Sequence, residues 1–351
     1  MNTPRSYGLD CLRAIAIILV VFVHSMPSMP PDLRVSMAYF DLAGCIGVDL
    51  FFVLSGFLMG KQIYQKNGVN TLGGLMNFSI KRFFRTYPLY LSFLLINFFL
   101  FVDSDPVTLI PYLTFTQIWM PADSGKWFFY GESWTLSIEE WFYFSISFFP
   151  FMLGLFGANY RLCVGIIVCL LCLNSNVVRW LEINESLVDL DLVRCSTSFR
   201  MDSLCYGFLV SMIPARMFKW FAKKELATVF FILAISMYIL MRSPENHLTK
   251  WAFFTLPQVC LAFILPNFSG IKAPKKRVMF YVVSWTARIS FSLYLVNLIP
   301  WRLNWFNGWE YGYFTVLITY FIICYLLSSV SFFLIEIPFM KIRSYLLETI
   351  K

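Results

Sequence analysis

Two ionisable side chains interrupt the first apolar stretch of the chain, residues 9–24. Arg13 lies near the start of this stretch and His24 at its end. At 100° per residue the eleven steps between them add up to about 1100°, roughly 20° more than three turns, so on a helix both side chains project from one face, about 16 Å apart along the axis. Ionisable groups inside a membrane are costly and often functional. Arginine that extends to the headgroups and histidine that ends the helix near water would also explain the pattern.

Two carboxylates are candidates for chemistry beside this histidine. Asp49 opens the second apolar stretch, and Glu139 lies near the start of the fourth. A carboxylate next to an imidazole fixes its tautomer and stabilises the imidazolium, as a general base or a histidine nucleophile requires. Each carboxylate also has a structural explanation, Asp49 as a helix cap and Glu139 as an acidic group at a helix N-terminus. The other histidine, His247, is expected in a short outer loop, so His24 is the predicted base.

The third candidate element is the basic run Lys81, Arg82 and Arg85, which precedes Pro88. Two arginines three residues apart share one face of a helix, where they are able to hold a phosphate or pyrophosphate from two sides. Basic residues beside an apolar span also anchor the cytoplasmic side of a membrane protein. Both interpretations are open at this point, and we expect the following span to begin around Pro88.

The composition predicts the class of fold that positions these groups. Hydrophobic residues make up 59% of the chain and charged residues 14%, and the mean hydropathy is +0.68. These values are typical of an all-α, polytopic integral membrane protein. We predict about ten transmembrane helices, at residues 10–28, 45–63, 86–102, 134–157, 162–178, 199–215, 226–241, 251–266, 286–303 and 313–335.

Charge sets the expected topology. An even number of spans puts both termini on one side, and most of the lysines and arginines fall on that side, so both termini are predicted to be cytoplasmic. The net charge of +8 therefore indicates topology, and no nucleic-acid partner is expected. We expect one transmembrane domain over residues 1–351, a first span that is retained, and no appended soluble domain. Cys169 and Cys172 lie within an apolar run, which favours packing, and no metal site is predicted.

The opposite side carries two loops of mixed character. Residues 103–133 combine aromatic side chains with Asp103, Asp105, Asp123 and Glu132, a mixture able to bind a sugar but also typical of an interfacial aromatic belt. Residues 179–198 are expected to form a second loop. Just after it, Arg200 and Asp202 enter the sixth span together. Local pairing or headgroup contact is the expected arrangement, and a role at the outer end of a central cavity is the alternative.

Five blocks of the sequence follow one another over nearly the whole chain. They are Leu9-Asp10-x-Leu12-Arg13 followed by His24; Gly47-Val48-Asp49-Leu50-Phe51-Phe52-Val53-Leu54-Ser55-Gly56-Phe57; Arg82-x-x-Arg85 with Pro88; Trp134-x-Leu136-Ser137-x-Glu139-x-x-Phe142-Tyr143; and Ile335-Glu336-x-Pro338-Phe339. In order and spacing these blocks resemble the acyltransferase-3 family of integral-membrane O-acyltransferases. Each block alone is weak, but the five in order are specific.

The resemblance implies a ten-helix enzyme of the bacterial inner membrane. Such an enzyme takes an acetyl group from cytoplasmic acetyl-CoA, its acyl donor, to a hydroxyl of a surface polysaccharide, such as lipopolysaccharide O-antigen, or of its lipid-linked precursor. Arg13 and His24 match the family's Arg-x10-His element, Arg82 and Arg85 its RxxR element, and Glu139 its carboxylate block. With Lys81, the two arginines of the RxxR element are expected to hold the phosphates of acetyl-CoA. Asn297 stands where many members have a histidine, which argues against a catalytic role for that position.

A transporter or flippase is the alternative function. Ten spans with buried charges and basic cytoplasmic loops are typical of secondary carriers as well. An acyltransferase consumes acetyl-CoA and leaves a new ester on a glycan or lipid-linked glycan acceptor, whereas a carrier moves an unmodified substrate. Membrane lipid is a partner in either case, and the sequence assigns no oligomeric state.

Overall fold

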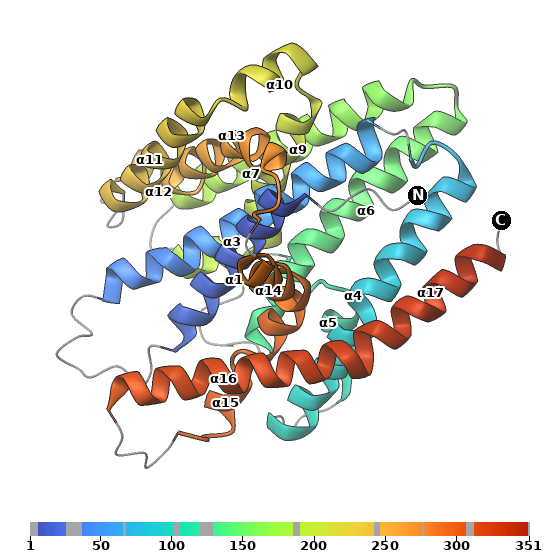
Figure 1. Ribbon diagram of the computed structural model, residues 1–351. Helices are drawn as coiled ribbons and strands as arrows, with labels where there is room; N and C mark the ends of the chain where they lie inside the picture. Colours follow the sequence, from blue (N-terminus) through green and yellow to red (C-terminus); the bar gives the residue numbers. More distant parts are fainter. Residues whose placement is uncertain are drawn as a thin grey trace. The chain divides into compact units, whose positions relative to one another are not determined.

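The computed structural model describes residues 6–25, 37–65, 68–101, 106–119, 129–184, 190–241, 246–275, 277–306 and 312–349. Within these ranges the regular structure is helical and no β-strand occurs, which confirms the all-α prediction (Figure 1). The chain divides into two compact units, and the helices α3 (Met37–Gly60) and α4 (Leu72–Phe101) each contribute residues to both. The expectation of one domain over residues 1–351 stays a prediction.

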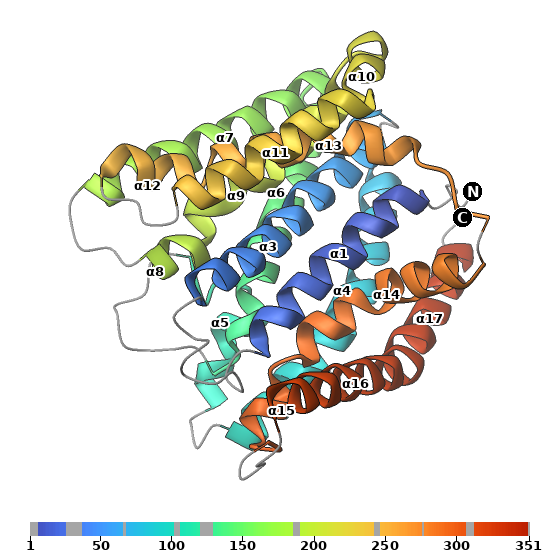
Figure 2. The ribbon, with the colours of Figure 1, turned by 60° about the vertical axis from the view of Figure 1, so that its left-hand side comes forward.

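The first unit comprises Met1–Val48, Ile80–Leu100 and Lys272–Lys351. Besides parts of α3 and α4, it contains α1 (Tyr7–His24), α14 (Arg277–Val296), α15 (Ile299–Arg302), α16 (Tyr313–Ser331), the π-helix η5 (Phe332–Glu336) and α17 (Ile337–Thr349). Helix α14 packs against α1 on one side and α16 on another, as Figure 2 shows. This packing brings the end of α1 to a segment far away in the sequence.

The second unit comprises Asp49–Ser79 and Phe101–Ile271. Its short elements are η2 (Lys61–Gln65), η3 (Pro106–Leu109), α5 (Ile110–Leu113), η4 (Gly131–Ser133), α8 (Leu190–Cys195), α10 (Ala215–Phe221) and α12 (His247–Phe253). Its long helices are α6 (Trp134–Leu155), α7 (Tyr160–Asn184), α9 (Thr197–Met212), α11 (Lys224–Leu240) and α13 (Leu256–Gly270). Helix α9 packs against α6, α7 and α13, so its side chains form the centre of the unit.

The structure supports a multi-pass membrane protein. Among the described residues, seven segments are long and apolar enough to cross a bilayer: Tyr7–His24, Leu42–Gln65, Leu72–Leu100, Tyr160–Ile183, His247–Gly270, Arg277–Arg302 and Tyr313–Glu348. The other three predicted spans coincide with α6, α9 and α11, of which α9 and α11 have only 16 and 17 residues. A helix needs about 20 residues to cross the hydrocarbon core. The count of ten and the cytoplasmic termini stay predictions.

The predicted start of the third span is wrong. Helix α4 begins at Leu72 and passes through Pro88, so this proline does not start the span. Proline removes one backbone donor from a helix, and neighbouring elements in a membrane protein are able to compensate for the loss. The basic run at 81–85 therefore lies within a continuous helix, which confirms the condition under which its two arginines share a face.

One side of α7 exposes apolar side chains, as expected for a helix that contacts lipid. Leu162, Leu170 and Leu173 are 63%, 57% and 59% exposed. Their spacing of eight and three residues puts them on one side of the helix. An apolar stripe of this kind is unfavourable in water but expected where a helix faces hydrocarbon. It agrees with the hydropathy of the segment.

Helices α3 and α9 cross at two glycines of the second unit, and we expect both to be required for stability. A Cβ atom added at Gly56 would lie 1.9 Å from the backbone oxygen of Leu204, and one added at Gly207 would lie 1.8 Å from that of Val53. Gly56→Ala and Gly207→Ala should each lower the free energy of unfolding by about 1–3 kcal/mol or more, because the backbones must move apart. Gly154→Ala on α6 is the matched control, since no atom lies within 4 Å of its added Cβ. Thermal unfolding in detergent measures the difference, and equal midpoints for all three variants would contradict the close crossing.

Candidate active site

The structure brings His24 together with Asn297. His24 is the last residue of α1, and Asn297 follows the end of α14 and is fully buried. The Nδ1 atom of His24 lies 2.5 Å from the Oδ1 atom of Asn297, a hydrogen bond across 273 positions of sequence. No sequence pattern predicts this contact, apart from the unusual residue type at position 297.

Asn297 is itself held firmly by the helices of the first unit. Its Nδ2 atom donates to the backbone oxygens of Tyr294, at 2.6 Å, and Leu293, at 3.3 Å. Its own backbone oxygen accepts a hydrogen bond of 2.9 Å from the hydroxyl of Tyr320, on α16. The amide that contacts the imidazole is therefore anchored from both its side chain and its main chain.

Arg13 lies on the same unbroken helix as His24. Helix α1 contains both residues without interruption, which supports the geometry predicted for their shared face. The Nη1 atom of Arg13 forms an ion pair with Oδ1 of Asp10, one turn earlier, at 3.2 Å. Asp10 is 4% exposed, so this arginine meets a buried carboxylate near the start of the helix.

Lys81, Arg82 and Arg85 form a basic face on α4. On a helix these three positions fall within an arc of about 100°, and in the structure Lys81 and Arg85 are exposed. The opposite side of the same turns is aromatic, where Phe83 stacks on Tyr87 with 4.9 Å between ring centroids. Aromatic packing on one side thus leaves the three cations together on the other, an arrangement suited to a phosphate ligand.

A buried glutamate accompanies this basic face. Glu336, at the end of the π-helix η5, accepts a hydrogen bond from the hydroxyl of Ser292 and interacts electrostatically with Arg85. Nearby, the rings of Phe84 and Phe339 lie 6.4 Å apart, so α4 meets α17 at this level. Glu336, which directly precedes α17, therefore interacts with side chains of both α14 and α4.

Two hydrogen-bond partners of Glu139 lie in the second unit. Its Oε1 atom accepts a hydrogen bond from the hydroxyl of Ser55 on α3, and its Oε2 atom accepts one from the hydroxyl of Tyr143, both at 3.1 Å. Two hydroxyl donors, one for each oxygen, suit an ionised carboxylate. Of the two adjacent glutamates in α6, Glu139 is the one that faces α3.

Asp49 is the partner of a buried arginine. Its Oδ1 atom accepts from Nη2 of Arg200. Its Oδ2 atom accepts from the hydroxyl of Tyr238 at 2.5 Å and from Nε2 of Gln258 at 3.1 Å. The guanidinium also lies 5.0 Å from the ring centroid of Phe254. Both oxygens of Asp49 thus accept hydrogen bonds in a network that links α3, α9, α11 and α13.

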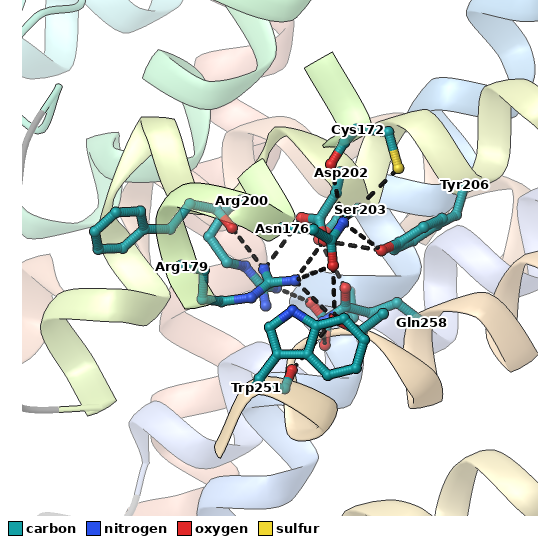
Figure 3. A network of polar contacts seen from close by, with 12 residues as sticks. Cys172, Asn176, Arg179, Arg200, Asp202, Ser203, Tyr206, Trp251 and Gln258 are labelled. Atoms are coloured by element: carbon teal, nitrogen blue, oxygen red, sulfur yellow. Dashed lines mark hydrogen bonds and ion pairs between the residues drawn. The ribbon is translucent and has the colours of Figure 1, made fainter. Parts of the chain in front are cut away.

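A second ion pair lies in the same unit, as Figure 3 shows. Both side chains of the pair Arg179–Asp202 are fully buried, with Nη2 and Oδ2 2.7 Å apart. Arg179 also donates to the hydroxyl of Thr255 at 2.7 Å, and the hydroxyl of Tyr206 donates to Asp202 at 3.0 Å. This cluster joins α7, α9 and the segment before α13.

The expected local pairing of Arg200 with Asp202 is wrong. Residues two apart on a helix point about 200° apart, so these two side chains leave α9 in nearly opposite directions. Arg200 pairs with Asp49 and Asp202 pairs with Arg179. The cross-helix partner Arg179 falls in the predicted loop at 179–198, but α7 continues to Asn184. On this helix Arg179 also donates to the Oδ1 atom of Asn176, one turn earlier, at 3.1 Å.

The predicted sugar-binding loop is described only in part. Asp103, Asp105 and Asp123 lie outside the described residues. Glu132 is buried within η4, where it is 3% exposed. Trp119 packs against Trp141 with ring centroids 4.6 Å apart, which gives this side of α6 an aromatic surface. Within the described ranges, no cluster of three or more histidine, cysteine or acidic residues has the arrangement of a metal site.

The helices and the buried polar contacts define a multi-pass membrane protein with an imidazole held inside one of its units. Comparison with known proteins identifies its chemistry. The chain matches the acyltransferase domain over residues 6–341 and belongs to the acyltransferase-3 family, so it is a membrane acyltransferase.

One curated relative is the acyltransferase MdmB of Streptomyces mycarofaciens. It is 28% identical to this chain over 152 residues, which cover 41% of this chain and 38% of the relative. The match thus spans well under half of either protein. No solved structure shows a significant match to the chain.

Proposed function

We propose that the protein transfers an acetyl group from cytoplasmic acetyl-CoA to a hydroxyl of a surface polysaccharide, such as lipopolysaccharide O-antigen, or of its lipid-linked precursor. The proposed location is the bacterial inner membrane. The observation that carries the proposal is His24, an imidazole at the end of an apolar helix in a chain of the acyltransferase-3 family. Family membership favours acyl transfer over the transporter or flippase alternative.

His24 is the proposed reactive group. As a general base it removes the proton of the acceptor hydroxyl, whose oxygen then attacks the thioester carbonyl, while the departing thiolate of coenzyme A takes the proton from the imidazolium. As a nucleophile it attacks the carbonyl itself, displaces coenzyme A as its thiolate and carries the acetyl group as an acyl-imidazole. The acceptor hydroxyl then attacks the acetyl carbon, the imidazole leaves, and it takes up the proton of that hydroxyl. Rapid quenching after addition of acetyl-CoA without acceptor distinguishes these routes, since only the second leaves label on the protein.

The other site residues have proposed roles around this step. Lys81, Arg82 and Arg85 hold the phosphates of acetyl-CoA, and Arg13 continues the polar face of α1 toward His24. For Glu139 we propose a role in the acyl-transfer step as a hydrogen-bonded carboxylate, and for Asp49 a supporting role through Arg200. No metal is required for any of these roles, because the imidazole supplies both proton transfer and nucleophilicity.

The direct test is mass spectrometry of the cell-surface glycan from strains with and without the gene. We expect an acetyl-sized mass increment, removed by alkali, only when the gene is present. Membranes that contain the protein should move label from acetyl-labelled coenzyme A to glycan. If the glycans of the two strains are identical and the protein moves an unmodified substrate instead, the proposal is wrong.

Removal of either arginine of the basic face should weaken donor binding. Arg82→Gln and Arg85→Gln are each expected to raise KM for acetyl-CoA about 10- to 100-fold, because a hydrogen bond to a charged group contributes about 1.5–3 kcal/mol. The value of kcat should change little. Arg277→Gln is the matched control, since Arg277 is an exposed arginine of the same unit on another helix, α14. Equal KM values for all three variants would contradict this role and would leave membrane anchoring as the explanation of the two arginines.

A further inference from the structure

We propose that Asn297 is a positioning residue that holds His24 in the tautomer with its proton on Nδ1 and its lone pair on Nε2. The inference rests on the proposed function in one respect: it makes Nε2 the nitrogen that reacts. It assigns a role to a position where the expected family residue is absent, and it follows from contacts within the first unit alone.

The first step is the orientation of the asparagine amide. Its Nδ2 atom lies within hydrogen-bond distance of two backbone oxygens, those of Leu293 and Tyr294. An amide turned the other way would place its oxygen against these two carbonyl oxygens, which have no proton to donate. The contacts therefore fix the amide with Oδ1 directed at His24.

The second step is the imidazole. An amide oxygen only accepts hydrogen bonds, so the contact of 2.5 Å requires that Nδ1 of His24 carries a proton. In a neutral imidazole the other nitrogen then has the lone pair. Nε2 is thus prepared for proton transfer or attack on a carbonyl.

The third step is rigidity. Asn297 is fully buried, and its backbone oxygen is bound by the hydroxyl of Tyr320. Neither the side chain nor the main chain of Asn297 is able to turn away without losing a hydrogen bond in a buried site. The orientation of the imidazole ring and its tautomer are therefore set by the packing of α1, α14 and α16 before any substrate binds.

The tautomer is directly measurable, because the chain has only two histidines. Protein labelled with ¹⁵N in the histidine imidazoles and carrying His247→Gln has a single labelled residue, His24. Nitrogen NMR distinguishes a protonated from an unprotonated ring nitrogen, and couplings to the ring protons tell Nδ1 from Nε2. We expect the neutral form to carry its proton on Nδ1. A neutral form with its proton on Nε2 would overturn the proposal, whatever the activity of the protein.

Variants at Asn297 test the role in turnover. Asn297→Leu keeps the shape but removes the acceptor, and we expect a mixture of tautomers and a kcat lower by about 10²-fold, with KM for acetyl-CoA nearly unchanged. Asn297→Asp restores an acceptor for Nδ1, so it should restore the tautomer and much of kcat. A purely structural role would instead lower the unfolding temperature in both variants without changing the tautomer.

Failure of this inference is distinguishable from failure of the proposed function. If His24→Ala is inactive while Asn297→Leu keeps the parent tautomer and kcat, only the role of Asn297 is wrong. If His24→Ala still acetylates the glycan, the proposed mechanism is wrong, and the NMR result still reports whether Asn297 fixes the ring.

Discussion

Replacing His24 with alanine should lower acyl transfer by about 10²- to 10⁴-fold, the range by which a positioned acid–base group accelerates a reaction. The loss is expected in kcat, because the imidazole acts on the reacting atoms and the proposed donor contacts lie on α4. Transfer of label from acetyl-labelled coenzyme A to glycan, in membranes with matched amounts of protein, measures the effect.

The chain offers a matched control for this experiment in its other histidine. The Nε2 atom of His247 lies 2.7 Å from the backbone oxygen of Trp180, and its ring packs edge-on against that indole. His247→Ala should therefore keep near-parent activity. Normal product levels in His24→Ala, or equal losses in the two variants, would contradict the proposed role of His24 in the reaction.

Loss of the buried cation Arg179 should be the largest single effect on stability. Arg179→Leu leaves the carboxylate of Asp202 fully buried without its ion-pair partner. Removing one partner of a buried pair costs about 3–5 kcal/mol, because the remaining charge has lost both water and its counter-ion. We expect a correspondingly lower midpoint of thermal unfolding in detergent and a lower yield in the membrane.

Two further variants separate this effect from a general intolerance of mutation. The double variant Arg179→Leu with Asp202→Asn has no unpaired charge and should recover most of the lost stability. Arg161→Leu removes an exposed arginine from the same helix and should cost less than about 1 kcal/mol. If the double variant is as unstable as the single one, packing and not charge explains the role of Arg179.

Local patterns were enough to predict which candidate residues share a helix face. The shared face of Arg13 and His24 depends only on helical spacing, and α1 runs unbroken through both. The basic face at 81–85 follows from the same rule. Composition likewise predicted an all-α membrane protein, since apolar stretches of sufficient length are a property of the sequence alone. Boundaries were less certain, as Pro88 shows, because a membrane protein tolerates proline within a helix.

Contacts between distant helices were not predictable in this way. Asn297 meets His24, and Arg179 meets Asp202, because particular faces of α1 and α14, and of α7 and α9, pack together. Sequence spacing gives the direction of a side chain on its own helix but says nothing about which helix lies opposite. Residue types and helical periods thus determined the class of protein, the candidate base and the basic face. Only tertiary packing decided which polar group each buried charge and the imidazole would meet.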